Sequence, residues 1–176
     1  MNILIDFDWT LYDIAALRED AESASLMEHW LTGLLWDYFD PADYFYPDAL
    51  PWLVAQREAG ASIQLISIHH GPDWGAPAES FQRRKIAGSG VAEYVDSITI
   101  VSGQKADHIG PLLITDDINL FIDDLPEEVT SVAARYEEVQ CVRMARPGSK
   151  YVELPTPAGV PEITQLADFD PMVYTV

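Results

Sequence analysis

The sequence predicts an α/β protein with a doubly wound, mostly parallel sheet flanked by helices, as in Rossmann-like folds. Short apolar runs of strand length alternate along the chain with longer segments of helical pattern. The helical segment 47–60 leads directly into the apolar run 61–68, which is the helix-then-strand order of a parallel sheet. Polar residues also follow several of the runs at once, and ligands of such sheets bind outside the carboxyl ends of the strands.

Each element has a local reason in the sequence. Gly60 lies just past the end of the first helix after residue 46, Gly88 and Gly90 end the next, and Pro126 stands in the first turn of another. The predicted strands are 3–5, 61–68, 94–101, 118–122 and 138–144. The predicted helices outside segment 13–46 are 47–60, 79–89, a short one at 106–109, 126–136 and a further one at 161–169.

Size and charge limit the class of protein. A chain of 176 residues with 48% hydrophobic residues fits one domain, 1–176. The formal charge of −19, with ten lysines and arginines, argues against a nucleic-acid partner, since nucleic acids are held through clustered basic residues. No apolar stretch approaches the length of a membrane span, so we expect a soluble, cytoplasmic protein and no membrane partner. The lone Cys141 is expected in the core, and the sequence gives no indication of the oligomeric state.

Segment 13–46 is the most aromatic part of the chain. Apolar residues at helical spacing predict one or two helices here, with Ser25 as an N-cap three residues before Glu28. We expect its tryptophans, tyrosines and phenylalanines mainly to pack in a core, because aromatic side chains bury large areas wherever they occur. The alternative is a lid whose rings stack on a flat group such as a nucleotide base.

The first strand ends in an unusual way. Three aliphatic residues suited to a buried central strand are followed at once by Asp6, Asp8 and Thr10. A carboxylate at the edge of a buried strand costs several kcal/mol to desolvate, so Asp6 indicates a nearby cation. Taken alone, the two acids could equally cap the turn.

Two further strand ends carry single polar groups. Ser67 ends the second strand and is followed by His69 and His70, but adjacent residues of an extended segment point in opposite directions, which disfavours a shared metal. Lys105 follows the third strand. A lysine there is normally a solvated surface residue, yet in so acidic a chain it is one of few groups able to hold a phosphate.

A second acid pair, Asp123 and Asp124, follows the fourth strand. Two adjacent carboxylates repel each other unless they share a cation, and a helix N-cap would explain only one of them. The run 112–117 also ends in two aspartates, but the helix that opens at Pro126 directly after Asp124 favours the later pair.

The ordered set resembles the four motifs of the haloacid dehalogenase-like hydrolases. These are an aspartate pair after the first strand, a serine or threonine after the second, a lysine, and an acidic pair after a later strand. The resemblance spans about residues 6 to 124 and is most specific at residues 3–10 and 120–124. Segment 13–46 stands where many members insert a cap, so a small helical cap is expected.

The resemblance implies a phosphatase, a phosphoric monoester hydrolase, with two catalytic aspartates. Asp6 would be the nucleophile that forms an aspartyl-phosphate. Asp8 would protonate the leaving oxygen and then activate water. An acid at position 8 favours ester hydrolysis over dehalogenation, because a departing halide needs no proton.

The remaining motif residues imply a cofactor and a phosphate site. Mg²⁺ would be held by Asp6, Asp8 through its backbone carbonyl, Asp123 and Asp124. The phosphoryl oxygens would be bound by three further groups, which are Thr10, Ser67 and Lys105.

The expected substrate is a small phosphomonoester, and the aromatic segment favours a nucleotide, as in 5′-deoxyribonucleotidases. Two alternatives remain: a phosphatase acting on a nucleic-acid end or a phosphoprotein, and a catalytically silent binding module with the same fold. Trp9 is the best support for the silent module, because many relatives carry glycine there. The complete set of acids, serine and lysine argues against it.

Overall fold

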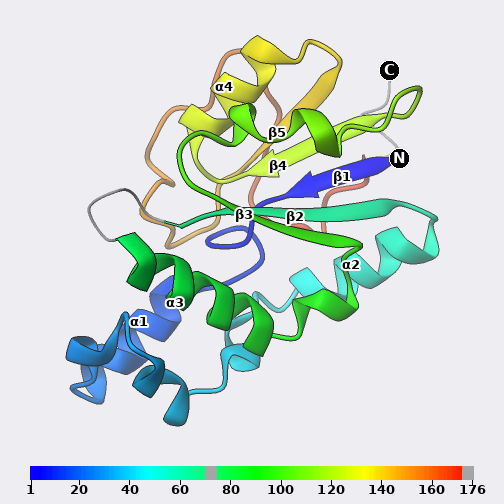
Figure 1. The fold of residues 1–176 in the computed structure, drawn as a ribbon. Helices are drawn as coiled ribbons and strands as arrows, with labels where there is room; N and C mark the ends of the chain where they lie inside the picture. Colours follow the sequence, from blue (N-terminus) through cyan, green and yellow to red (C-terminus); the bar gives the residue numbers. More distant parts are fainter. Residues whose placement is uncertain (70–74, 172–176) are drawn as a thin grey trace.

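The computed structural model describes residues 1–69 and 75–171 and contains one six-stranded sheet (Figure 1). The strand order is β3-β2-β1-β4-β5-β6 and every neighbouring pair is parallel. The chain moves outward from β1 in one direction and then in the other, so the switch point of the topology is at β1. The strands are β1 (Asn2–Ile5), β2 (Ser62–Ile68), β3 (Ser97–Val101), β4 (Asn119–Asp123), β5 (Val139–Met144) and β6 (Glu162–Ile163).

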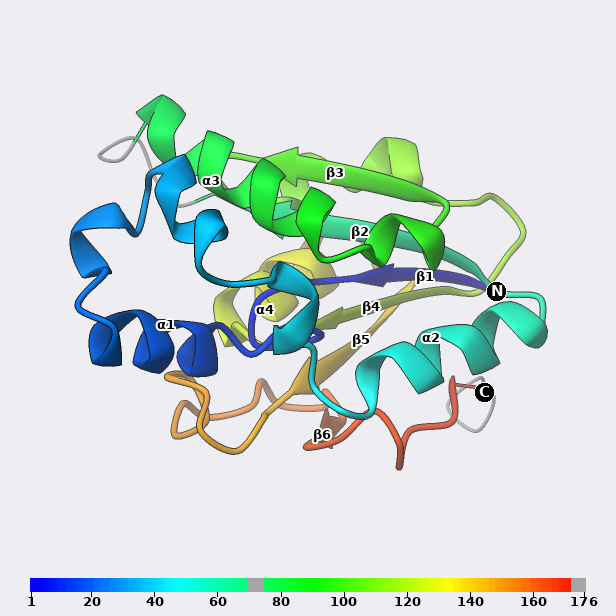
Figure 2. The same ribbon diagram turned by 90° about the horizontal axis from the view of Figure 1, so that it is seen from below.

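Helices cover both faces of the sheet. α2 and α3 lie on one face and α4 on the other, as the two perpendicular views show (Figures 1 and 2). The α-helices are α1 (Ile14–Ser23), α2 (Ala49–Glu58), α3 (Gly75–Gly88) and α4 (Pro126–Arg135). Short 3-10 turns, which we label η, are η1 (Met27–His29), η2 (Gly33–Asp37), η3 (Pro41–Tyr44), η4 (Val91–Glu93), η5 (Lys105–Asp107) and η6 (Gly110–Leu112).

The alternation of side chains along β1 produces two cores. Ile3 and Ile5 join the cluster that contains residues of α2 and α3, whereas Leu4 joins the cluster beneath α4. All three side chains are fully buried, as expected for a central strand covered on both faces. The predicted fold class is therefore confirmed.

Most of the predicted elements are present near their predicted bounds, and Cys141 is buried. The run 112–117 forms no strand, whereas Asp123 is the last residue of β4 and Asp124 follows it, so the predicted strand end is confirmed. The helix predicted at 161–169 is wrong. β6 begins at Glu162 instead, because the backbone there pairs with the end of β5.

Segment 13–46 contains one α-helix, α1, followed by η1, η2 and η3. The N-cap predicted at Ser25 is wrong, because Ser25 has a φ of 60° and its N–H donates to the carbonyl of Glu22, closing the turn after α1. Asp13 caps α1 by accepting from the N–H groups of Ala15 and Ala16.

Several aromatic rings of this segment pack on other rings. Trp30 and Trp36 lie on Phe81 of α3, with centroid distances of 5.5 and 5.2 Å. Tyr44 and Phe45 pack against Tyr12. These contacts are the core packing that we favoured for the aromatics.

Among the described helices, none is both long and apolar enough to cross a bilayer.

Candidate active site

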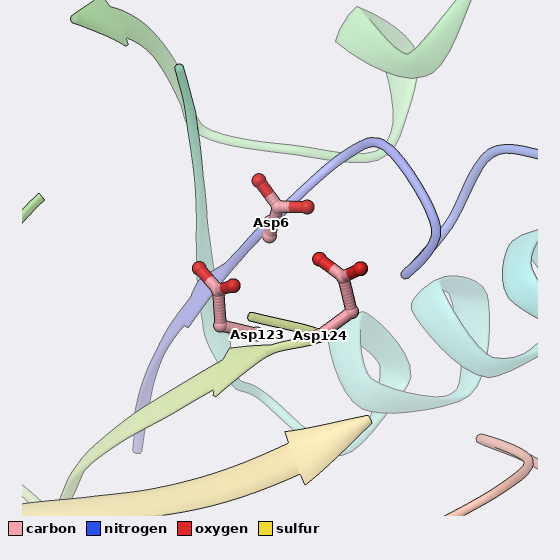
Figure 3. A group of neighbouring side chains, drawn as sticks. All are labelled: Asp6, Asp123 and Asp124. Carbon is pink, nitrogen blue, oxygen red and sulfur yellow. The ribbon is translucent and has the colours of Figure 1, made fainter. Parts of the chain in front are cut away.

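Three buried carboxylates converge at the carboxyl edge of the sheet (Figure 3). Asp6 directly follows β1, Asp123 is the last residue of β4, and Asp124 follows it. β1 and β4 are hydrogen-bonded neighbours, so their ends bring the two motifs together. One oxygen from each carboxylate lies within 4.8 Å of the others. The sequence expectation that these acids share one place is met.

Lys105 lies among these acids. Its side chain is 2% exposed, and its ammonium donates to Asp6 Oδ1 and, at 2.5 Å, to Asp123 Oδ2. The Lys105 backbone N–H donates to Glu128 Oε2 of α4 at 2.7 Å, which fixes the start of η5. Lys105 is therefore part of the site rather than a solvated surface lysine.

The charges of this group are only partly compensated. Burial raises the pKa of Asp6 to about 7 against the opposing attraction of Lys105. Burial and the charge of Asp6 raise the pKa of Asp124 well above its ordinary range. Burial alone would lower the pKa of Lys105, but Asp123 and Asp6 outweigh it and raise that pKa. One ammonium thus stands against three carboxylates.

This donor set fits a divalent cation. It consists of carboxylate oxygens, the ligands that Mg²⁺ prefers, and its members carry more negative charge than Lys105 neutralises. Asp123 Oδ1 accepts from the N–H of Leu125, so that carboxylate is held in a fixed orientation. Asp6, Asp123 and Asp124 could therefore hold the ion.

The turn after Asp6 is tightly built. The N–H groups of Leu11 and Tyr12 both donate to the carbonyl of Phe7, and Trp9 N–H donates to the carbonyl of Tyr12. Trp9 has a φ of 62°, in the left-handed region that favours glycine. The chain thus keeps at Trp9 a conformation that glycine would adopt without strain, and the turn forms despite the tryptophan.

Arg146 is bonded to the same turn. Its guanidinium donates to the carbonyl of Thr10 at 3.0 and 3.2 Å and to Asp48 at 2.8 Å, and it lies over the ring of Tyr46. Thr10 is fully buried, and within the described residues its hydroxyl has no hydrogen-bond partner. The Thr10 side chain is therefore enclosed by the protein. Its predicted contact with a phosphate stays a prediction.

Ser67 and Asp8 are joined by a side chain of α3. Gln82 Nε2 donates to Ser67 Oγ and to Asp8 Oδ2, both at 2.8 Å. Lys85, also on α3, donates to Asp8 Oδ1 at 2.5 Å. Burial lowers the pKa of Lys85, while the charge of Asp8 opposes that change. All four strand-end motifs thus lie around one place.

Gln82, Lys85, Glu128 and Arg146 were not predicted from the sequence. Lys85 could have been suspected, because it shares a helical face with Phe81 and the chain has only three lysines. The other three carry no such signal. His69 directly follows β2, and His70 falls outside the described residues, so the prediction for the histidine pair stays a prediction.

No family model matches the chain, and no curated protein matches it by sequence. Several solved structures do match the chain in fold. A haloacid dehalogenase-like family hydrolase from Xanthomonas campestris has a TM-score of 0.63 at 13% identity, covering 99% of this chain and 94% of that one. The D,D-heptose 1,7-bisphosphate phosphatase from Burkholderia thailandensis has a TM-score of 0.61 at 13% identity, covering 99% of each chain.

The corresponding phosphatase from B. bronchiseptica, complexed with magnesium and phosphate, has a TM-score of 0.57 at 14% identity and covers 94% of this chain and 93% of that one. Structural similarity at such low sequence identity shows the fold alone. The chain has the fold of the haloacid dehalogenase-like hydrolases, as its motifs predict.

Proposed function

We propose that the chain is a Mg²⁺-dependent phosphatase that hydrolyses a small phosphomonoester. The observation that carries the proposal is the contact of Lys105 with both Asp6 and Asp123 at the carboxyl edge of β1 and β4. This contact supports the proposal because the carboxylate proposed as nucleophile, an ammonium and a carboxylate proposed as a metal ligand lie in one buried cluster at the switch point of the sheet. Solved phosphatases with the same fold support the same reaction class.

Asp6 and Asp8 carry the covalent chemistry in this proposal. An Asp6 oxygen attacks phosphorus, the bond to the leaving oxygen breaks, and Asp8 gives that oxygen a proton. Asp8 then takes a proton from a water whose oxygen attacks the same phosphorus. The bond to Asp6 breaks, which frees the carboxylate and inorganic phosphate.

The remaining residues bind and orient. Asp6, the carbonyl of Asp8, Asp123 and Asp124 would hold Mg²⁺, which when bound offsets the repulsion between the Asp6 carboxylate and an anionic phosphate. Lys105 and Ser67 would bind phosphoryl oxygens, and Lys105 places positive charge where the transition state develops negative charge.

The substrate class is a small phosphorylated metabolite, with segment 13–46 as a small cap beside the site. A nucleotide remains the specific candidate within that class. Because Trp30 and Trp36 already pack on Phe81, fewer rings are left to bind a base than the sequence suggests. Turnover rates on a panel of nucleotides and sugar phosphates decide whether the substrate is a nucleotide or a sugar phosphate.

The test is release of p-nitrophenol from p-nitrophenyl phosphate. We expect turnover with Mg²⁺, none with EDTA, and none after Asp6→Asn, while Asp37→Asn on the surface keeps parent activity. Turnover that survives in Asp6→Asn would refute the covalent route. A parent protein that is inactive with every divalent metal would favour the silent binding module.

A further inference from the structure

Helix α3 supplies two buried polar side chains to the site. Gln82 and Lys85 are one turn apart, so they lie on the same face of α3. Gln82 is 4% exposed and Lys85 1% exposed. Lysine and glutamine are seldom buried to this extent without a partner that requires them.

Both oxygens of Asp8 are held by this pair. Lys85 donates to Oδ1 at 2.5 Å, and Gln82 donates to Oδ2 at 2.8 Å. The Asp8 side chain is nevertheless 24% exposed, whereas that of Lys85 is 2% exposed. Asp8 is thus fixed from the protein side and keeps one side open. A carboxylate has about four acceptor positions, so two donors leave capacity for a proton on the open side.

Gln82 also connects two motifs. The same Nε2 that donates to Asp8 donates to Ser67 Oγ at 2.8 Å. The relative position of the predicted acid and the predicted phosphate-binding hydroxyl is therefore set by one amide group. An error in either position would move the leaving oxygen away from the proton donor.

The surroundings of Lys85 hold its ammonium in place. The Nζ atom lies 5.7, 5.5 and 5.4 Å from the ring centroids of Phe7, Tyr12 and Phe81. These rings attract a cation through their faces. Phe81 is itself covered by Trp30 and Trp36, so the lysine has little freedom to move.

Fold stability alone is a weak reason for this arrangement. Replacing both members of a buried ion pair by apolar residues of similar size is often neutral or stabilising. Packing alone would therefore be served equally well by an apolar pair at positions 8 and 85, with methionine, for example, at position 85. What a methionine would lack is a donor to Asp8 Oδ1. The contact that distinguishes Lys85 is therefore its contact with Asp8.

We propose that Lys85, aided by Gln82, is a positioning residue that orients Asp8 for proton transfer to the leaving group. The inference rests on the proposed phosphatase activity. Lys85 itself touches no substrate, since its ammonium is enclosed by Asp8 and the three rings. Its contribution should depend on how much the leaving group needs a proton.

The experiment compares two aryl phosphates of similar shape. p-Nitrophenolate departs readily without a proton, whereas phenolate is more basic and benefits from one. We expect Lys85→Met to lower kcat/KM for phenyl phosphate at least about tenfold more than for p-nitrophenyl phosphate. Lys85→Arg should restore most of this loss, because arginine also donates. Lys150→Met, at an exposed lysine, should match the parent on both substrates.

A double variant separates positioning from a structural role. In an Asp8→Asn background, Lys85→Met should cause no additional loss, because the residue it orients is gone. An equal loss on both substrates, or a full additional loss in the Asp8→Asn background, overturns the proposal.

Crystal structures of the Lys85→Met and Lys85→Arg proteins test the positioning independently of activity. We expect the Asp8 carboxylate to leave its place in the methionine variant and keep it in the arginine variant. If Asp8 stays in place in Lys85→Met, the inference fails even where phosphatase activity is present. An inactive parent would refute the proposed function and this inference with it, whereas an active parent whose Asp8 stays in place in Lys85→Met would refute the inference alone.

Discussion

Asp6→Asn should increase the stability of the metal-free protein at neutral and higher pH while it removes activity. Asparagine has nearly the shape of aspartate but no charge. In the folded protein burial raises the pKa of Asp6 from 3.8 to about 7. The folded state therefore holds a proton that the unfolded state has already released between these two pH values.

The sign and the size follow from this difference. Because the folded state binds more protons in that window, the free energy of unfolding falls as pH rises through it. Between about pH 5 and about pH 8, a shift of this size corresponds to roughly 2 to 3 kcal/mol. Asp6→Asn removes the titrating group, so the variant should gain about that much relative to the parent at the higher pH.

Urea unfolding in EDTA at the two pH values measures the effect. The difference between Asp6→Asn and the parent should be larger at about pH 8 than at about pH 5. Asp37→Asn, at an exposed position, should differ from the parent by less than about 0.5 kcal/mol at both. A difference that is the same at both pH values, or a variant less stable than the parent at high pH, would show that Lys105 compensates the buried charge of Asp6 fully rather than in part.

Three further outcomes are expected. Mg²⁺ should raise Tm more at pH 8 than at pH 5, because protons on Asp6 and Asp124 compete with the ion at low pH. Differential scanning fluorimetry measures both Tm values, and an equal rise in Tm at the two pH values would contradict this prediction. Lys105→Met should lower the free energy of unfolding by about 3 to 5 kcal/mol at pH 8, because buried carboxylates lose their cation, and a loss under about 1 kcal/mol in urea unfolding would contradict this. Trp9→Gly should be more stable than Trp9→Ala by about 1 to 2 kcal/mol, because both lose the ring but only alanine keeps the cost of a φ of 62°; equal stabilities would show no strain there.

The strand-end residues were predictable because topology places them. Asp6, Ser67 and Asp123 each lie at the carboxyl end of a parallel strand, and the ends of neighbouring parallel strands meet along one edge. Hydrophobic runs identify such strands without any knowledge of side-chain contacts. The fold and the convergence of the motifs follow from that pattern.

The supporting residues were not predictable in the same way. The partner of Lys85 depends on how α3 is rotated against β1 and β2, which helical spacing alone does not specify. Arg146 meets Thr10 across 136 positions of sequence. The helix predicted at 161–169 was wrong for a related reason, because the sequence pattern there does not show that Glu162 pairs with β5. Long-range partners decide these positions, and one sequence does not identify them.

The distribution of lysine connects the charge of the protein to its site. The chain has a formal charge of −19 and three lysines, and Lys85 and Lys105 are both buried at the carboxyl edge of the sheet against Asp8, Asp6 and Asp123. An anionic phosphate approaching this protein meets net repulsion at long range, which salt screens beyond about 10 Å. Attraction must therefore come from charges within the site itself. The acids around these two lysines outnumber them, so a bound divalent cation would have to supply most of that attraction, with Lys105 contributing directed hydrogen bonds in the proposed reaction.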